Sequence, residues 1–397
     1  MATTPSGRTA PAASGDHEVS PRAEETNYAE HQDLHSEQGA RRGEHPGRAT
    51  NPTVKVSGLA WLEFEKRDLD TAERFARDFG FAVHARTDDA LHLRGARAGA
   101  PCMVIRRGRT SRFVGPVFAA AEAGDLDRLA RAAGGSVQDR KDLGAGRTVR
   151  LTDPSGVAVQ VVHGVEELPE LPLQEPLQWN VAGGTARTNA TQRPEREPSR
   201  VERLGHVVMA SRVFARNLDW YLQHLGLIVS DFLYLEGRRD RGPTMAFIRC
   251  DRGSVPSDHH TLAMLLHPKP GYVHSAYEVA DLDALAAGGE YLREQGRHHS
   301  WGIGRHIQGS QIFDYWRDPD HVMVEHYTDG DLFDSSVETG WAPMSASGLR
   351  QWGPRPTRDF IDATPGPELA RTALEALRED NELDVRTLLA LARAMSK

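Results

Sequence analysis

The stretch LGHVVMASRVFARNLDWYLQHLGL, residues 204–227, decides the fold because an earlier stretch repeats its pattern. That earlier stretch is SGLAWLEFEKRDLDTAERFARDFGF, residues 57–81, and the two align without a gap on HLGL and DFGF. Each copy predicts a strand with alternating apolar residues, followed by an amphipathic helix that ends at a glycine. The alignment places His206 of the second copy opposite Ala60 of the first. The chain therefore contains a duplicated unit whose copies differ at one potential metal ligand.

The duplication continues to the end of each unit and adds two further contrasts. The strand-like runs GYVHSAYEV and RFVGPVFAA align His274 with Gly115. The closing strands follow an Asp-Pro turn, in DYWRDPDHVMVEH and RLTDPSGVAVQVV, and align Glu325 with Gln160. All three contrasts place a metal-binding side chain in the second copy and a poor ligand or none in the first. The sequence therefore predicts a metal site in the second unit alone.

The three predicted metal ligands are His206, His274 and Glu325. Two imidazoles and one carboxylate can bind one face of a divalent cation and leave the opposite face open, as in non-haem Fe(II) oxygenases. The remaining positive charge lets the ion attract an anionic bidentate substrate as well as O₂. A structural zinc site would usually have four protein ligands and be rich in cysteine, whereas this chain has only Cys102 and Cys250.

Length, composition and charge argue against several other classes of protein. The chain has 397 residues, enough for two domains, and its 39% hydrophobic and 26% charged residues are typical of a globular protein. A net charge of −8 argues against nucleic acid as a partner, because phosphate binding requires a basic surface. The sequence shows no membrane-spanning run and no signal-peptide-like segment. Because the two cysteines fit a reducing compartment, we expect a cytoplasmic protein without membrane partners.

The second unit resembles the catalytic domain of the type I extradiol ring-cleavage dioxygenases, which belong to the vicinal oxygen chelate superfamily. The resemblance is carried by HHSWGIGRHIQGSQIFDYWRDPDHVMVEHYTDG, residues 298–330, and extends over both repeats, from about residue 55 to 335. In this family a Gly-Arg-His sequence is followed by a tyrosine, an Asp-Pro pair and the glutamate ligand. Here these residues are Gly304, Arg305, His306, Tyr315, Asp318, Pro319 and Glu325.

The resemblance implies an α+β fold of paired βαβββ modules in two tandem domains. It also implies a structural, metal-free N-terminal copy, which agrees with the residues found there. His321 stands where the family commonly has glycine, so we expect a local adjustment of that turn and no loss of activity. The expected divisions are a disordered tail (1–53), an N-terminal domain (54–170), a linker (171–200), a catalytic domain (201–335) and a C-terminal arm with helices (336–397).

By resemblance, His260 is the acid–base residue that helps to deprotonate a bound catechol and delivers a proton for O–O cleavage. Adjacent strand residues point to opposite faces, so only one of His259 and His260 can face the metal, and the pattern HTLA favours His260. His306 and Tyr315 are implied to hydrogen-bond the ligating hydroxyl and to carry or orient its proton. Trp301, Arg305, Asp240 and Asp231 remain open between a functional and a structural role.

The predicted function is extradiol cleavage of a catecholic aromatic by O₂ at a mononuclear Fe(II), with Mn(II) as the other metal that these ligands suit. Such an enzyme would serve aromatic hydrocarbon catabolism, and we expect a homo-oligomer. Two alternatives stay open. A glyoxalase-like isomerase or lyase would turn over without O₂, and a non-catalytic binding protein on the same scaffold would need no metal. The C-terminal helices could cover a domain face, mediate oligomerisation or bind another protein.

Overall fold

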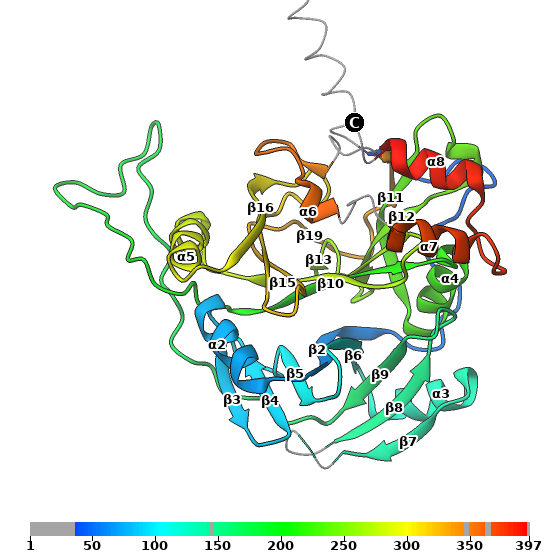
Figure 1. The fold of residues 1–397 in the computed structure, drawn as a ribbon, viewed down its shortest axis with the longest axis horizontal. Coiled ribbons are helices and arrows are strands. Elements are labelled where there is room, and N and C mark those ends of the chain that lie inside the picture. The colour runs from blue at the N-terminus through cyan, green and yellow to red at the C-terminus, as the bar shows by residue number, and fades with distance from the viewer. Residues whose placement is uncertain (1–35, 141, 143–145, 345–348, 362–366, 395–397) are drawn as a thin grey trace, which may run out of the picture.

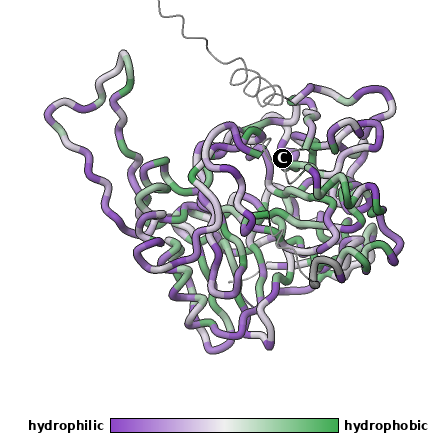
Figure 2. Tube along the Cα trace, turned by 45° about the horizontal axis from the view of Figure 1, so that its top comes forward, coloured by the Kyte–Doolittle hydropathy of each residue, from purple (hydrophilic) through white to green (hydrophobic). Residues whose placement is uncertain are grey.

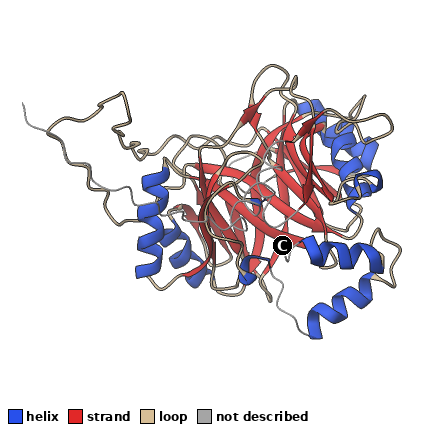
Figure 3. Cartoon of the chain, turned by 90° about the horizontal axis from the view of Figure 1, so that it is seen from above, coloured by secondary structure: helices blue, strands red, loops and turns tan. Residues whose placement is uncertain are grey.

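The computed structural model describes residues 36–394 apart from 141, 143–145, 345–348 and 362–366. In these residues the strands form two large sheets at the centre of the molecule, and most helices lie outside them (Figure 3). Each sheet is built from two modules in which one strand is followed by a helix and three further strands. This confirms the predicted fold of paired βαβββ modules.

The N-terminal sheet has eight strands. Its first module contains β2 (Val56–Lys66), α2 (Leu69–Phe79), β3 (Ala82–Arg86), β4 (Ala90–Arg94) and β5 (Met103–Arg107). Its second contains β6 (Arg112–Ala120), α3 (Ala123–Ala133), β7 (Ser136–Asp139), β8 (Arg147–Thr152) and β9 (Ala158–His163). The strand order is β3-β4-β5-β2-β6-β9-β8-β7, so the first strands of the two modules pair at the centre.

The C-terminal sheet repeats this plan. Its first module contains β10 (Arg203–Ser211), α4 (Phe214–Leu225), β11 (Leu227–Leu235), β12 (Met245–Cys250) and β14 (Leu262–Leu266). Its second contains β15 (Gly271–Glu278), α5 (Leu282–Glu294), β16 (His298–Arg305), β17 (Ile312–Arg317) and β18 (Met323–Thr328). The short elements η1 (Arg239–Arg241), β13 (Ser257–Asp258) and β19 (Leu332–Phe333) lie between or after these strands. None of the helices in the described part of the chain is long and apolar enough to span a bilayer.

Two segments outside the predicted domains extend the C-terminal sheet to ten strands, in the order β1-β20-β11-β12-β14-β10-β15-β18-β17-β16. The strand β20 (Gly340–Met344) comes from the predicted arm and pairs in parallel with β11. The strand β1 (Glu37–Gln38) comes from the predicted tail and pairs with β20. Residues 36–53 therefore differ from the expected disorder, because backbone hydrogen bonds, which polar composition does not reveal, hold them to the sheet. Residues 1–35 lie outside the described residues.

The first helix of each domain begins and ends where local sequence signals place it. The Asp68 side chain accepts hydrogen bonds from the first turn of α2, and Gly80 ends that helix with a φ of 103°. Gly226 ends α4 in the same left-handed conformation, with a φ of 65°. However, α4 has 12 residues and α2 has 11, although each begins three residues after the preceding strand ends. An alignment of the two copies on their helix ends is therefore shifted by one residue in the strands that precede the helices.

This difference in helix length corrects the first sequence contrast. The register pairs His206 with Ala276, and Ala276 with Glu325. In the N-terminal sheet the corresponding row runs from Gln160 to Val117 and on to Trp61. The residue that occupies the position of His206 is therefore Trp61 and not Ala60. The ungapped alignment was wrong here because it was anchored at the helix ends, and the conclusion that the position lacks a metal ligand is unchanged.

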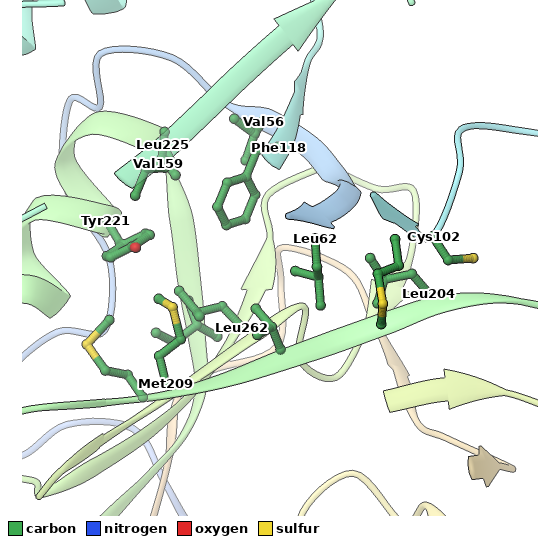
Figure 4. Close-up of a cluster of buried hydrophobic side chains, with 14 of the residues drawn as sticks. Val56, Leu62, Cys102, Phe118, Val159, Leu204, Met209, Tyr221, Leu225 and Leu262 are labelled. Atoms are coloured by element: carbon green, nitrogen blue, oxygen red, sulfur yellow. The ribbon is translucent and has the colours of Figure 1, made fainter. Parts of the chain in front are cut away.

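The two domains share one hydrophobic core. Leu62 and Phe118 of the N-terminal sheet lie in the same buried cluster as Met209 and Leu262 of the C-terminal sheet (Figure 4). Residues 171–200, the predicted linker, connect the domains and run out from the body as an extended arm (Figure 1). Hydrophobic residues concentrate in the body of the molecule, whereas the outer loops are largely hydrophilic (Figure 2).

Candidate metal centre

Three neighbouring strands bring the predicted metal ligands together. Because β10, β15 and β18 lie side by side, His206, Ala276 and Glu325 form one row across the sheet. His274 lies two residues before Ala276 and therefore points to the same face. One ligand atom from each of His206, His274 and Glu325 lies within 4.8 Å of the other two. His206 and His274 are 68 positions apart along the chain, and His274 and Glu325 are 51 apart, yet the three side chains meet. The methyl group of Ala276 lies between them.

The buried carboxylate of Glu325 lacks the partner that a metal ion would supply. Its side chain is 0% exposed, and its Oε2 lies 3.4 Å from Nε2 of His206 and 3.2 Å from Nε2 of His274. Neither oxygen has a hydrogen-bond partner among the described residues, and the same holds for Nδ1 of both histidines. An unpaired buried carboxylate is costly, and a divalent cation removes that cost. The donor set therefore fits a metal ion.

The protonation states of these groups also suit a metal. Burial disfavours the charged form of Glu325, but His206 and His274 outweigh that effect and hold the pKa of this carboxyl below its ordinary value. Burial lowers the pKa of His274. At neutral pH the site therefore presents a carboxylate and a neutral imidazole at His274, which are the forms that ligate metals.

His260 lies beside the metal site and is connected to a carboxylate through His259. The ring centroids of His260 and His206 are 4.0 Å apart. Nδ1 of His260 lies 3.1 Å from Nδ1 of His259, whose Nε2 lies 2.7 Å from Oδ2 of Asp231. Both histidines lie in the turn between β13 and β14, so strand alternation does not decide which one faces the site. The contacts show that His260 lies against His206, whereas His259 bonds Asp231. Asp231, whose role the sequence left open, therefore supports this pair of histidines.

His306 and Tyr315 lie on the opposite side of Glu325. Tyr315 is the partner of Glu325 in the pairing of β17 with β18, and its hydroxyl lies 2.9 Å from Nε2 of His306. Nδ1 of His306 lies 2.6 Å from the carbonyl oxygen of Leu349, so this nitrogen carries the proton and donates it. Burial lowers the pKa of His306 to about 4. A neutral His306 then accepts a hydrogen bond from the Tyr315 hydroxyl.

The other three residues whose role the sequence left open pack in the core or lie near the surface. Trp301 is 1% exposed, stacks on Tyr315 with ring centroids 5.5 Å apart, and donates to the carbonyl of Pro354. Arg305 pairs with Asp329 at 2.7 Å and therefore stabilises its loop. The side chain of Asp240 is 79% exposed and lies on η1.

The equivalent position in the N-terminal domain is filled by a closed polar cluster. Gln160 donates to Glu63 at 2.8 Å, and Trp61 donates to the same carboxylate at 3.3 Å. Arg140 donates to the Gln160 oxygen at 3.2 Å, and its guanidinium lies 4.8 Å from the centroid of the Trp61 ring. Both oxygens of Glu63 are engaged by these contacts, so this cluster leaves no open set of ligands for a metal.

The turn before Glu325 does not show the local adjustment that was expected at His321. His321 has a φ of 64°, in the left-handed region that favours glycine. The matching turn of the N-terminal domain has Gly156 there, with a φ of 86°. Asp318 holds the turn by accepting hydrogen bonds from the backbone of Asp320 and Val322. The histidine is accommodated without a change in the turn.

The sequence missed the part that the C-terminal segment plays at this site. Leu349 supplies the carbonyl that orients His306, and the edge of β16 is bridged to Trp352. Phe360, on α6 (Arg358–Ile361), packs on Tyr315 with ring centroids 4.8 Å apart. The sequence predicted a C-terminal arm here, but nothing in the sequence indicated which face of the domain the arm covers.

Comparisons with known proteins show the family to which the chain belongs. Residues 203–326 match the model of the Glyoxalase/Bleomycin resistance protein/Dioxygenase superfamily. Metapyrocatechase 2 of Cupriavidus necator is 31% identical over 84% of this chain and 99% of its own length. Biphenyl-2,3-diol 1,2-dioxygenase of Pseudomonas sp. (strain KKS102) is 23% identical over 74% of this chain and 92% of its own length. The chain therefore belongs to the type I extradiol ring-cleavage dioxygenases of the vicinal oxygen chelate superfamily.

Solved structures share the fold. Homoprotocatechuate 2,3-dioxygenase from Brevibacterium fuscum, in its complex with 3,4-dihydroxyphenylacetate, superposes with a TM-score of 0.64 at 18% identity, covering 81% of this chain and 96% of its own. A Mn(II)-bound glyoxalase from Novosphingobium aromaticivorans superposes with a TM-score of 0.65 at 22% identity, covering 79% of this chain and 97% of its own. At these identities the likeness shows the fold alone.

Proposed function

We propose that the chain opens the ring of a catecholic substrate by extradiol cleavage with O₂, at a mononuclear Fe(II) held by His206, His274 and Glu325. The observation that carries the proposal is the convergence of these three buried side chains on one face of the sheet. Membership of the family supports it. Mn(II) is the other metal that the same ligands suit. Held by these three residues, a ferrous ion would supply a Lewis-acid and redox centre for catechol and O₂.

Tyr315 and His306 are suited to handle the proton of a substrate hydroxyl. The bond from His306 Nδ1 to the Leu349 carbonyl fixes the tautomer and leaves Nε2 as a proton acceptor. The Tyr315 hydroxyl, 2.9 Å from that nitrogen, can accept a proton from the substrate while it passes its own to His306. This pair therefore forms a route by which a proton leaves the buried site.

His260 is suited to act on the other side of the centre. Its Nδ1 is engaged with His259, so Nε2 is the ring nitrogen available to the substrate or to oxygen. A fixed imidazole in a buried site can take a proton at one step and return it at a later one. The arrangement thus places a separate proton acceptor on each side of Glu325.

The test is the variant Glu325→Gln, which keeps the shape of the side chain and removes its charge. We expect the purified variant to lose bound iron, measured by mass spectrometry, and to lose O₂ uptake with a panel of catechols. Glu290→Gln, on the exposed surface of α5, is the matched control and should keep both. A Glu325→Gln protein that retained full iron content and activity would contradict the proposal.

We also propose that the enzyme works in the cytoplasm and as a homo-oligomer. Cys102 and Cys250 are free, buried thiols, as expected of a protein in a reducing compartment. The C-terminal helices expose large apolar side chains that a second copy could cover. Sedimentation analysis of the purified protein tests the second point, and a purely monomeric protein at working concentrations would contradict it. The exposed side chains are Leu374, Leu377, Val385 and Leu389.

A further inference from the structure

We propose that the C-terminal helix α8 (Val385–Ala394) selects the substrate by closing one side of the catalytic cup, and that the ring substituent on that side is uncharged and apolar. The cup is the inner face of the C-terminal sheet, the face that carries His206, His274 and Glu325. This inference rests on the proposed ring-cleavage function and specifies which catechols the site accepts.

An apolar row of residues runs directly beside the metal ligands. The register pairs Phe247 with Ala263, Ala263 with Val208, and Val208 with His274. Because paired residues on adjacent strands point to the same face, the three apolar side chains continue the face that carries His274. Phe247 also meets His260 edge to face, with ring centroids 5.1 Å apart. The wall next to the proposed acid–base residue is therefore apolar.

The helix α8 packs against this wall. Ala394 belongs to the same buried cluster as Val208 and Phe247, and Ala390 packs against that cluster. These two alanines are one helical turn apart, so they face the wall together. Figure 1 shows α8 near β11, with which it is in contact. Leu391 of the same helix also packs against this cluster, so the helix and the wall are in direct contact. The other members of the cluster are Leu233, Leu235, Ala342 and Met344.

The charges of the domain favour the same class of substituent. Of the buried Lys and Arg side chains in the described residues, Arg249 alone belongs to the catalytic domain. Its terminal nitrogens donate to the carbonyls of Val229 and Val337 and to the Ser230 hydroxyl. A carboxylate placed against the apolar wall would lose its hydration without gaining a partner. An alkyl or aryl group there would instead be stabilised by leaving water.

The test compares Ala390→Leu with the control Ala392→Leu, which enlarges an exposed alanine of the same helix. Substrates are catechol, 3-phenylcatechol and 3,4-dihydroxyphenylacetate. We expect the unaltered enzyme to prefer 3-phenylcatechol over the carboxylate by about tenfold or more in kcat/KM, since an unpaired buried charge is disfavoured. In Ala390→Leu, kcat/KM should fall about tenfold for 3-phenylcatechol and little for catechol, as overpacking predicts. The control should behave as the unaltered enzyme.

A second measurement separates this inference from the proposed function. Dissociation constants of the same three compounds are measured by calorimetry without O₂, so that no turnover is needed. If no catechol is cleaved but Ala390→Leu weakens binding of 3-phenylcatechol selectively, the inference holds and the reaction was misassigned. If Ala390→Leu changes catechol and 3-phenylcatechol equally, or neither, the inference is overturned whatever the activity. Preference for the carboxylate would overturn it as well.

Discussion

Asp231 accepts a hydrogen bond from His259 across 2.7 Å, and this contact also orients His260. A carboxylate only accepts hydrogen bonds, so a neutral His259 carries its proton on Nε2. Its Nδ1 then accepts from Nδ1 of His260, 3.1 Å away. The free Nε2 of His260 is consequently a proton acceptor. Asp231 thus sets the tautomer of a residue that it does not touch, and we regard it as a positioning residue.

Replacing Asp231 with Asn should weaken this control of the tautomer. An amide can donate as well as accept, so His259 could reverse its ring protons and His260 would present a donor in place of an acceptor. We expect kcat to fall about tenfold, or about 1.4 kcal/mol in barrier height, with KM and iron content unchanged. Asp240→Asn, 79% exposed at its side chain, is the control. An unchanged kcat would show that His260 does not depend on this support.

Ala276 lies between His206 and Glu325, and its replacement by Val should weaken metal binding. The N-terminal domain has Val117 at the same place in its row, so the substitution suits the sheet. The added methyl groups would occupy space between the ligands at a position that is 0% exposed. We expect reduced iron retention during dialysis against a chelator, with little change in melting temperature. Val117→Ala is the converse control, which should leave iron retention unaltered and lower stability by about 2 kcal/mol.

Gly115 occupies the position of His274 in the N-terminal domain, and no side chain fits there. A Cβ atom would lie 1.8 Å from the carbonyl oxygen of Ala158 on β9. Gly115→Ala should therefore destabilise the protein by roughly 1–3 kcal/mol or more, measured by urea denaturation. Gly124→Ala is the control, because a Cβ there would approach only the Arg128 side chain, at 3.4 Å. Equal stability of the two variants would mean that β6 and β9 can separate easily.

Lys66 joins the domains through a buried ion pair, and its removal should be destabilising. Its side chain is 4% exposed and contacts the carboxylates of Asp318 and Asp320 in the turn before β18. Lys66→Ala leaves Asp318 buried without its cation, which should cost about 3 kcal/mol in free energy of unfolding. Lys55→Ala, which removes an ion pair with a 53% exposed lysine side chain, should cost less than about 1 kcal/mol. Similar losses for both variants would argue that the Lys66 pair does not tie the domains together.

Much of the architecture was predictable because its signals are local. Alternating apolar residues, helical spacing and capping residues such as Asp68 and Gly80 are read within a few positions of the chain. The repeat of these signals indicated two similar domains. Residue type alone then distinguished His274 and Glu325 from Gly115 and Gln160. The one-residue error at Ala60 arose because the alignment was anchored at the ends of two helices that differ by one residue in length. The register of the preceding strands becomes visible only when the strands are paired.

The sequence by itself determined the order of strands and helices and the chemical identity of the candidate metal ligands. Only the tertiary structure decided that His259 bonds Asp231, 28 residues away, and that α8 packs on the wall beside His274. Such contacts depend on how the sheet curves and where distant segments return to it. Local patterning fixes which face of a strand or helix is apolar, whereas the partner of that face is chosen by long-range packing.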